Sequence, residues 1–311
     1  MDVLEFQLAE HDPRTLDLLL CDKSTGGNIR WCTDAYAHQG TGFQPEDEMT
    51  PRSVSLLKDG VRPRALKSLT EQQFRTRDKG EVFTPAWVCN VQNSQVDRDW
   101  FGRDGVFNTL VDSGWVVNEE PIAFPPGKTW QEYADNRVLE ITCGEAPYLV
   151  GRYDAVSGLQ VPLFERVGLL DRKLRVVGEN AENDSQWMEW AQRAIESTYG
   201  FDYQGDNVLL ARENVLVSYG DYYEERFGSK PGIEVLHVIA NRIAWNIWQM
   251  DGYTCTAPHS SVAVDSEPVQ LSLFDGCENS AGVTMAPARC KVFNWRRGRS
   301  EYFDDCLGEW G

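Results

Sequence analysis

The sequence lacks any apolar segment long enough to cross a membrane. No apolar run approaches the roughly 20 residues of a transmembrane helix, and the first residues, MDVLEFQLAEHDPR, are acidic rather than typical of a secretory signal. Yet 41% of the 311 residues are hydrophobic and 11 are Trp, which suits a substantial core in one large domain or two modest ones. We therefore expect a folded cytoplasmic protein with no membrane partner.

Several common site motifs are also missing. The eight cysteines are scattered without a CxxC pair, and there are only four histidines, so the sequence predicts reduced thiols and no metal site. Cys255 and His259 are close in sequence, but a zinc site needs more ligands than this pair. Neither a GxxxxGK[ST] loop nor a GxGxxG fingerprint is present, which argues against a P-loop hydrolase and a dinucleotide-dependent dehydrogenase.

Positive charge is scarce. The chain holds 30 Lys and Arg against 48 Asp and Glu, a net charge of −18, which opposes non-specific binding to nucleic acid. Basic residues nevertheless cluster in residues 62–79 (RPRALKSLTEQQFRTRDK) and 289–299 (RCKVFNWRRGR). These stretches are the candidate phosphate-facing surfaces; the alternative is that they are solvated faces that balance an acidic surface.

Apolar runs and turn residues predict alternating strands and helices. Strands are expected at 138–141, 197–204, within IAWNIWQMDG (243–252) and at 290–295. Helices are expected at 84–96, within 124–136, directly after a turn at 143–144, at 166–178, 184–198, 206–228 and 233–242. This alternation predicts an α/β fold with a doubly wound, mostly parallel, Rossmann-like sheet. Residues 1–80 are expected to form an N-terminal appendage with a strand or two and a helix, ahead of a main domain at 81–311.

The stretch RDKGEVFTPAWVCN, residues 77–90, predicts the start of a helix. Thr84 is a preferred N-cap and Pro85 is favoured at the first helical position. The backbone N–H groups that follow have no partner within the helix, so such an end attracts carboxylates and other anions. The alternative is an ordinary capped helix on the surface.

Carboxylates follow three of the predicted strands. Glu140 or Glu145 belongs to the first turn, Asp202 ends the second strand and Asp251 ends the third. Ligands of an open α/β sheet lie beyond the carboxyl ends of the strands, where Gly144 would allow a close backbone approach. An acid after the second strand suits a ribose diol and one after the third suits an exocyclic amine, which together are the polar groups of an adenosine. The alternative for each residue is a surface or capping acid.

In chain order, GEVFTP, VLEITCGEAPYL, YGFDYQGDNVLLAREN and NIWQMDG resemble the S-adenosylmethionine site of amino-group DNA methyltransferases. More narrowly, they resemble the adenine-N6 modification subunits of restriction systems, over about residues 80–253. The resemblance implies a Rossmann-like methyltransferase sheet that binds S-adenosylmethionine and acts on DNA. It implies that the cofactor meets Phe83, Thr84, Pro85, Glu140, Cys143, Gly144, Asp202 and Asp251.

The chain departs from that family in three ways. Ala146 and then Pro147 stand where the second motif glycine is expected. Glu140 and Asp202 are much farther apart than the roughly 20 residues of a simple βαβ unit. The catalytic Asn/Asp-Pro-Pro-aromatic tetrapeptide is absent, and the nearest candidate is Asn294 followed by Trp295. If these two residues bind the target base, the phosphates beside it would meet Arg296, Arg297 and Arg299.

Two hypotheses follow from this reading. The chain is an active adenine-N6 methyltransferase, or a modification subunit that relies on a specificity or restriction subunit for recognition. Alternatively it is a catalytically inactive, methyltransferase-like protein that binds the cofactor or a protein partner. Because only 16 residues follow position 295, either residues 1–80 complete the sheet or the methyltransferase fold is partial.

Overall fold

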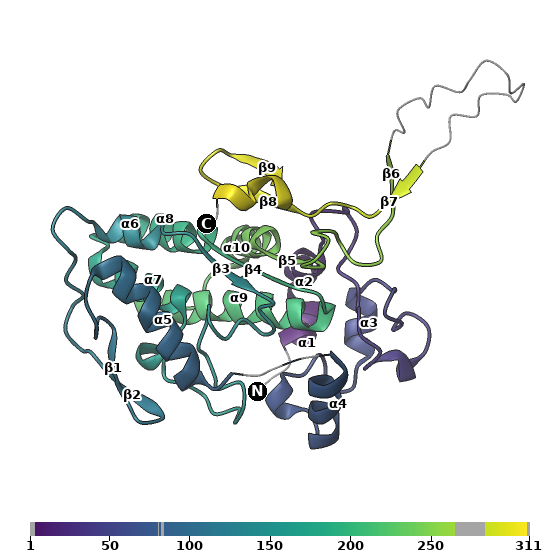
Figure 1. Cartoon of the computed structure of the whole chain (residues 1–311), viewed down its shortest axis with the longest axis horizontal. Helices are drawn as coiled ribbons and strands as arrows, with labels where there is room; N and C mark the ends of the chain where they lie inside the picture. Colours follow the sequence, from purple (N-terminus) through teal and green to yellow (C-terminus); the bar gives the residue numbers. More distant parts are fainter. Residues whose placement is uncertain (1–3, 80, 82–83, 265–283, 310–311) are drawn as a thin grey trace, which may run out of the picture.

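The computed structural model describes residues 4–79, 81, 84–264 and 284–309. A three-stranded parallel sheet in the order β3–β4–β5 lies at its centre (Figure 1). The strands are β3 (Val138–Ile141), β4 (Thr198–Asp202) and β5 (Ile247–Gln249). Glu140 pairs with Gly200, and Asp202 pairs with Gln249. The expected mixed α/β fold with a parallel sheet is therefore confirmed.

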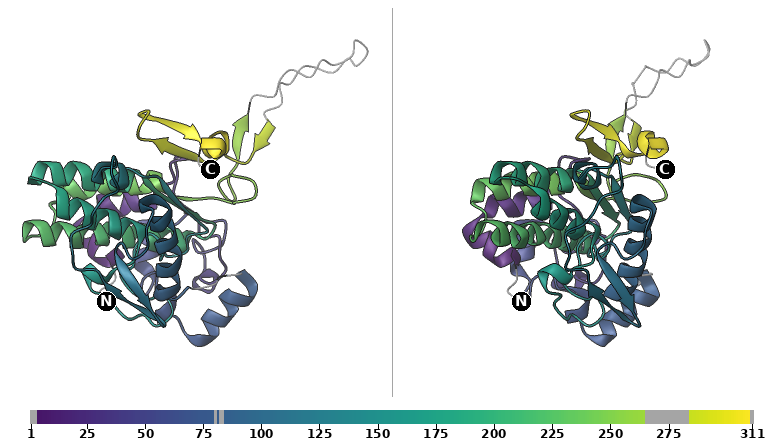
Figure 2. Two further views of the ribbon diagram at one scale, coloured as in Figure 1. Left: turned by 60° about the vertical axis from the view of Figure 1, so that its left-hand side comes forward. Right: turned by 90° about the vertical axis from the view of Figure 1, so that its left-hand side faces the viewer.

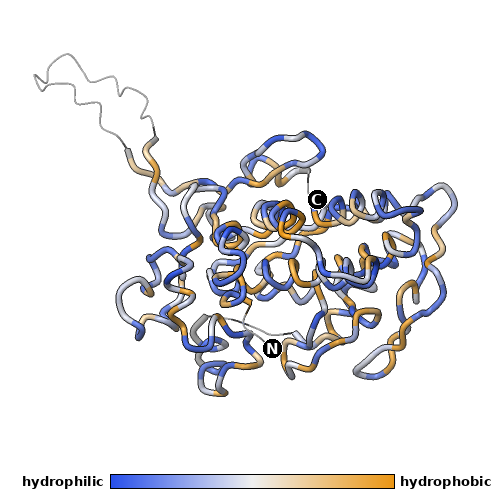
Figure 3. Tube along the Cα trace, turned by 180° about the vertical axis from the view of Figure 1, so that it is seen from behind, coloured by the Kyte–Doolittle hydropathy of each residue, from blue (hydrophilic) through white to orange (hydrophobic). Residues whose placement is uncertain are grey.

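Four helices share one apolar core with a face of this sheet. They are α7 (Leu169–Asn180), α8 (Asp184–Glu196), α9 (Gly205–Phe227) and α10 (Ile233–Asn246). Their buried side chains belong to the same cluster as Cys143 and Ile247. Figure 3 shows apolar residues along the helices at the centre of the molecule, interspersed with polar ones.

The other face of the sheet carries a C-terminal hairpin. Side chains alternate along a strand, and Tyr199, Phe201 and Trp248 belong to a second buried cluster with Val292 and Phe303. The hairpin consists of β8 (Lys291–Asn294) and β9 (Arg299–Tyr302), followed by α11 (Phe303–Cys306). Both views of Figure 2 show it standing above the helical layer.

The expectation that residues 290–295 form a fourth strand of the parallel sheet is wrong. β8 pairs antiparallel with β9 and lies outside that sheet. Gly298, at φ 65°, supports the tight turn between them. Among the described residues the order of parallel strands follows the chain, with no reversal, and a hairpin occupies the face opposite the helices. A doubly wound arrangement is thus not confirmed.

The N-terminal segment is helical and contains no strand within residues 4–79. It contains α1 (Leu4–His11), α2 (Pro13–Leu20), α3 (Pro51–Leu56) and α4 (Leu69–Lys79). Leu16 and Leu20 lie in the same core as α9 and α10. The side chain of Gln249 accepts from the Arg30 N–H and donates to the Arg30 carbonyl, at 2.7 Å each. The segment therefore abuts β5 but does not complete the sheet.

The remaining elements surround this centre. α5 (Ala86–Phe101) starts later and ends later than expected. The others are β1 (Asn108–Val111), β2 (Gly114–Val117), α6 (Trp130–Ala134), β6 (Val262–Val264), β7 (Thr284–Ala286) and four 3-10 turns at Ala37–Gln39, Arg64–Leu66, Leu163–Glu165 and Leu307–Glu309. The helix expected directly after residues 143–144 is absent, because Ala146 has φ 61° and Pro147 follows it. The chain after residues 143–144 instead forms a loop beside the ends of the strands.

A close backbone contact at Gly205 allows a test of the packing between α9 and the N-terminal segment. A Cβ at Gly205 would lie 2.0 Å from the Arg30 carbonyl oxygen. We expect Gly205→Ala to lower the free energy of unfolding by about 1–3 kcal/mol, as overpacking does. Gly220→Ala, in the same helix but with no atom within 4 Å of its Cβ, should be neutral or stabilise by up to about 1 kcal/mol. Urea unfolding of both variants distinguishes the contact from helix propensity.

Candidate functional site

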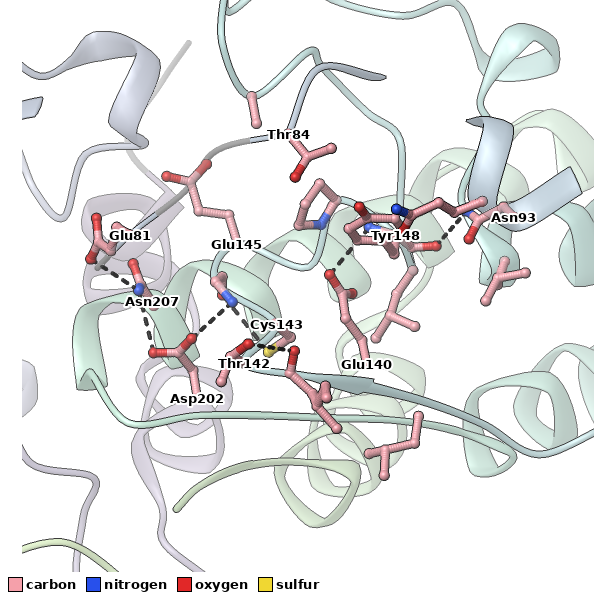
Figure 4. A pocket seen from close by; sticks show the side chains of 18 of the residues that line it. Glu81, Thr84, Asn93, Glu140, Thr142, Cys143, Glu145, Tyr148, Asp202 and Asn207 are labelled. Carbon is pink, nitrogen blue, oxygen red and sulfur yellow. Dashed lines mark hydrogen bonds between the residues drawn. The ribbon is translucent and has the colours of Figure 1, made fainter. Parts of the chain in front are cut away.

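A cavity of about 690 Å³ lies beyond the carboxyl ends of β3 and β4 (Figure 4). Parallel strands end at one edge, so the residues after each strand meet there. The cavity collects side chains from the segment before α5, from α5, from the turn after β3 and from the start of α9. Its polar lining includes Glu81, Thr84, Gln92, Asn93, Glu140, Thr142, Glu145, Tyr148, Asp202, Gln204 and Asn207.

The structure brings most of the predicted cofactor residues together. Thr84, Glu140, Cys143, Gly144 and Asp202 all line the cavity. They come from three separate parts of the chain, and the order of the strands places them side by side. Phe83 lies outside the described residues.

Asp202 connects the end of β4 to the turn after β3. Its Oδ2 accepts the Gly144 N–H at 2.9 Å, and its Oδ1 accepts the Gln204 N–H at 2.9 Å. Gly144 has φ 52°, which suits glycine. Burial raises the pKa of Asp202 to about 6, against the lowering effect of these hydrogen bonds. The carboxylate is therefore held in place but partly desolvated at the wall of the cavity.

The two carboxylate oxygens of Glu140 differ in their hydrogen bonding. Its Oε1 accepts the Tyr148 N–H at 3.4 Å, whereas its buried Oε2 has no hydrogen-bond partner among the described residues. Burial raises the pKa of Glu140 well above its usual value. Since an unpaired buried acceptor is costly, this oxygen is suited to a ligand that offers an N–H or O–H group.

The sequence did not identify Glu81, another carboxylate in the wall of the cavity. The side chain of Asn207 donates to Asp202 Oδ1 at 3.3 Å and to Glu81 Oε1 at 3.2 Å. Glu81 also accepts from Gln204 Nε2 at 2.7 Å. Glu81 belongs to GEVFTP and Asn207 to the stretch after Asp202, so both lie within quoted motifs, but nothing in the spacing indicates that they meet.

The start of α5 differs from the prediction. Its N-cap is Pro85 rather than Thr84, with no side-chain cap. The Ala86 N–H donates to Asp154 Oδ2 at 2.6 Å, so a carboxylate of the chain itself occupies the helix start. Pro85 does not line the main cavity but a second one of about 370 Å³, next to Trp87.

Asp251 lies away from the main cavity. β5 ends at Gln249, and the Asp251 Oδ1 accepts the backbone N–H groups of Tyr253 and Thr254 at 2.8 and 3.3 Å. This is the turn-capping role that the sequence left as the alternative for this acid.

Asn294 and Trp295 also lie outside the cavity, on the face that the hairpin covers. The Asn294 side chain donates to Glu301 at 3.0 Å and accepts the Arg297 N–H at 3.2 Å. The Trp295 indole N–H donates to Asn246 at 2.7 Å. Both side chains are thus held by the chain itself.

The two basic stretches are paired with acids. Arg296 meets Asp135 at 3.0 Å, and Arg297 and Arg299 meet Glu301 at 3.2 and 2.8 Å. These exposed pairs are weak and can exchange partners. In residues 62–79, by contrast, Lys67 and Arg75 are buried against Asp206. Those two side chains are not available to a phosphate, which corrects the expectation for Lys67 and Arg75.

The described cysteines are all free. Over the same described ranges, no group of three or more His, Cys, Asp or Glu is arranged to hold a metal ion. None of the described helices is both long and apolar enough to cross a membrane.

The structure is a mixed α/β protein with a carboxylate-lined cavity at the ends of parallel strands. Comparison of the chain with protein-family models, curated proteins and solved structures finds no match.

Proposed function

We propose that this chain binds S-adenosylmethionine in the main cavity and acts as the modification subunit of an adenine-N6 DNA methyltransferase. The observation that carries the proposal is the gathering of Thr84, Glu140, Gly144 and Asp202 around one cavity beyond the sheet. These are residues that the resemblance implies for the cofactor. The proposal includes a Rossmann-like core and DNA as the substrate, with a specificity or restriction subunit as partner.

The cavity suits this cofactor in size and charge. About 690 Å³ falls within the range of roughly 300–1,000 Å³ that small-molecule sites occupy. S-adenosylmethionine carries a sulfonium, an ammonium and one carboxylate, so its net charge is positive. Four carboxylates of the described residues line the cavity: Glu81, Glu140, Glu145 and Asp202. Glu140 would receive the ammonium on its free oxygen. Asp202 would receive a ribose hydroxyl on Oδ2, which among the described residues accepts only the Gly144 N–H. A cation between these acids offsets the cost of their burial.

Bound S-adenosylmethionine supplies an activated methyl group that an amine attacks directly in line. The residues of this chain would orient it, since Gly144 and Asp202 fix the turn against β4. Holding both reactants in place is itself a large part of catalysis. The acceptor amine would have to reach the open side of the cavity.

A second candidate is favoured by the position of Asn294 and Trp295. Their polar groups are bound to Glu301 and Asn246 on the hairpin face, away from the cavity. The chain would then be a methyltransferase-like cofactor-binding protein that acts with a protein partner. Methyl transfer from labelled cofactor to mixed-sequence DNA, with and without candidate partner subunits, separates the two functions. Activity that survives Asn294→Ala rules out a catalytic role for that residue.

The cofactor site has a direct test in Asp202→Ala. We expect it to weaken S-adenosylmethionine binding by about 1–3 kcal/mol, because a ribose hydroxyl and the Gly144 N–H lose a buried acceptor. Isothermal titration calorimetry measures the change. Asp251→Ala is the matched control and should leave the affinity unchanged, since Asp251 caps its own turn. A wild type that shows no binding at millimolar cofactor contradicts the proposed function.

A further inference from the structure

A buried network of charged side chains joins α4 to the wall of the main cavity. Arg75, on α4, is 2% exposed. Its Nη1 donates to Asp206 Oδ2 at 2.5 Å, and its Nε donates to Glu81 Oε2 at 2.7 Å. Asp206 is fully buried at the start of α9 and also meets Lys67 Nζ at 3.2 Å. One guanidinium therefore bridges two carboxylates.

Glu81 extends this contact to the ligand side of the wall. Its Oε1 accepts from Gln204 and from Asn207, and Asn207 donates in turn to Asp202. Glu81, Gln204, Asn207 and Asp202 all line the cavity. Figure 4 shows the continuous path from Glu81 through Asn207 to Asp202. Asp202 in turn accepts the Gly144 N–H.

The geometry calls for arginine at position 75. A guanidinium has donors on several edges of one plane and can serve two carboxylates at once, whereas an ammonium is a point charge. Lys67 already stands beside Asp206, so Asp206 would keep a cation without Arg75. Arg75 makes three hydrogen bonds to the Glu81 carboxylate, from Nε to both oxygens and from Nη2 to Oε1.

The same N-terminal segment touches the cavity at a second place. The Arg64 backbone N–H donates to Glu145 Oε1 at 2.5 Å, and Glu145 lies in the loop after Gly144. Through Arg64, Arg75 and Glu81 this part of the chain therefore contacts both the turn after β3 and the start of α9. The segment forms part of the site.

We propose that Arg75 is a positioning residue of the cavity, which holds Glu81 and, through it, the Gln204 and Asn207 amides against Asp202. The packing of α4 then determines whether these side chains are held in the positions that bind the ligand. The identity of that ligand rests on the proposed function, and the positioning role does not.

A double-mutant cycle with Arg75→Lys and Glu81→Gln tests this in the full chain. With S-adenosylmethionine as the probe, we expect each single variant to weaken binding about 10- to 100-fold, the range seen when an outer partner of a metal ligand is lost. If Arg75 acts through Glu81, the double variant should bind no more weakly than the weaker single variant. Additive losses, or an unchanged affinity in Arg75→Lys, overturn the positioning role.

Amide hydrogen exchange of the unliganded protein provides a second, ligand-independent readout. In Arg75→Lys we expect faster exchange in peptides that cover 142–149 and 202–209, where the Gly144 and Gln204 N–H groups bond Asp202. Arg212→Lys is the matched control: Arg212 is fully buried on α9 and donates to the Leu19 and Ile247 carbonyls, away from the cavity lining. It should destabilise the fold without this local change. Exchange in Arg75→Lys equal to wild type refutes the inference even if S-adenosylmethionine does not bind, an outcome that would refute only the proposed function.

Discussion

Replacing Arg172 by Met should lower the free energy of unfolding by about 3–5 kcal/mol, because it removes one partner of a buried ion pair. Arg172 on α7 pairs with Asp97 on α5, and each is 2% exposed. Its Nη2 also donates to Asn90 at 2.6 Å, while Asp97 accepts from the Tyr133 hydroxyl at 2.7 Å. The network joins α5 and α6 to α7. Its loss leaves a carboxylate buried without its cation.

Arg98→Met is the control for this prediction. Arg98 follows Asp97 on α5, but its pair with Asp104 spans 3.7 Å, with side chains 47% and 81% exposed. A pair so exposed contributes at most about 1 kcal/mol. In urea unfolding, Arg172→Met should therefore lose several times more free energy of unfolding than Arg98→Met. Equal losses would show that the Arg172 pair contributes no more than a surface contact.

The Arg172→Met effect should also depend on pH. Burial already raises the pKa of Asp97, while Arg172 and Tyr133 lower it. Without Arg172 that pKa rises further, so the folded variant holds a proton that the unfolded chain has released. Stability of the variant then falls as pH rises from the ordinary carboxyl value through the raised one. We expect a larger loss at pH 8 than at pH 5.

The parts of the site that could be predicted depend on local patterns. Residues 138–141 form a short apolar strand followed by a glycine turn, and Asp202 ends a fully buried one. Glu140 and Asp202 lie near the ends of neighbouring parallel strands, which end at the same edge of a sheet. Their position around one cavity therefore followed from the topology. Asp251 shares this sequence pattern, but its chain turns back at once and uses the carboxylate locally.

The parts that could not be predicted depend on pairing between distant residues. Arg75 and Asp206 are 131 positions apart, and in the sequence Arg75 is one of several cations in a basic stretch. Its burial follows only once α4 docks on α9. The sequence of residues 291–294 is equally compatible with a strand of the parallel sheet and with one strand of a hairpin. Its pairing with 299–302 decides between them. Periodicity reports which residues are apolar but not which partner they meet.

Glu140→Gln should stabilise the unliganded protein at neutral pH while weakening cofactor binding. Burial raises the pKa of Glu140, so the folded chain retains its proton at pH values where the unfolded chain has lost it. Its contribution to stability is present below the ordinary carboxyl pKa and is lost as pH rises through the raised one. Gln keeps an acceptor for the Tyr148 N–H and does not ionise. The variant should therefore melt at a higher temperature than wild type at pH 7–8, and the two should converge near pH 4.

Cofactor binding should respond in the opposite direction. An ammonium next to Glu140 favours the ionised carboxylate. Below the pKa of the ligand's α-amino group, about 7.7–8.0, wild-type affinity for S-adenosylmethionine should therefore increase as pH rises and Glu140 ionises. Asp202, with a pKa raised to about 6 by burial, contributes to the same trend and remains in the variant. Glu140→Gln should thus bind more weakly and show a shallower pH dependence. Calorimetry at pH 5, 6 and 7 in two buffers of different ionisation enthalpy measures both the affinity and the protons released. If proton release is the same in the variant and the wild type, the ligand does not reach the free oxygen of Glu140.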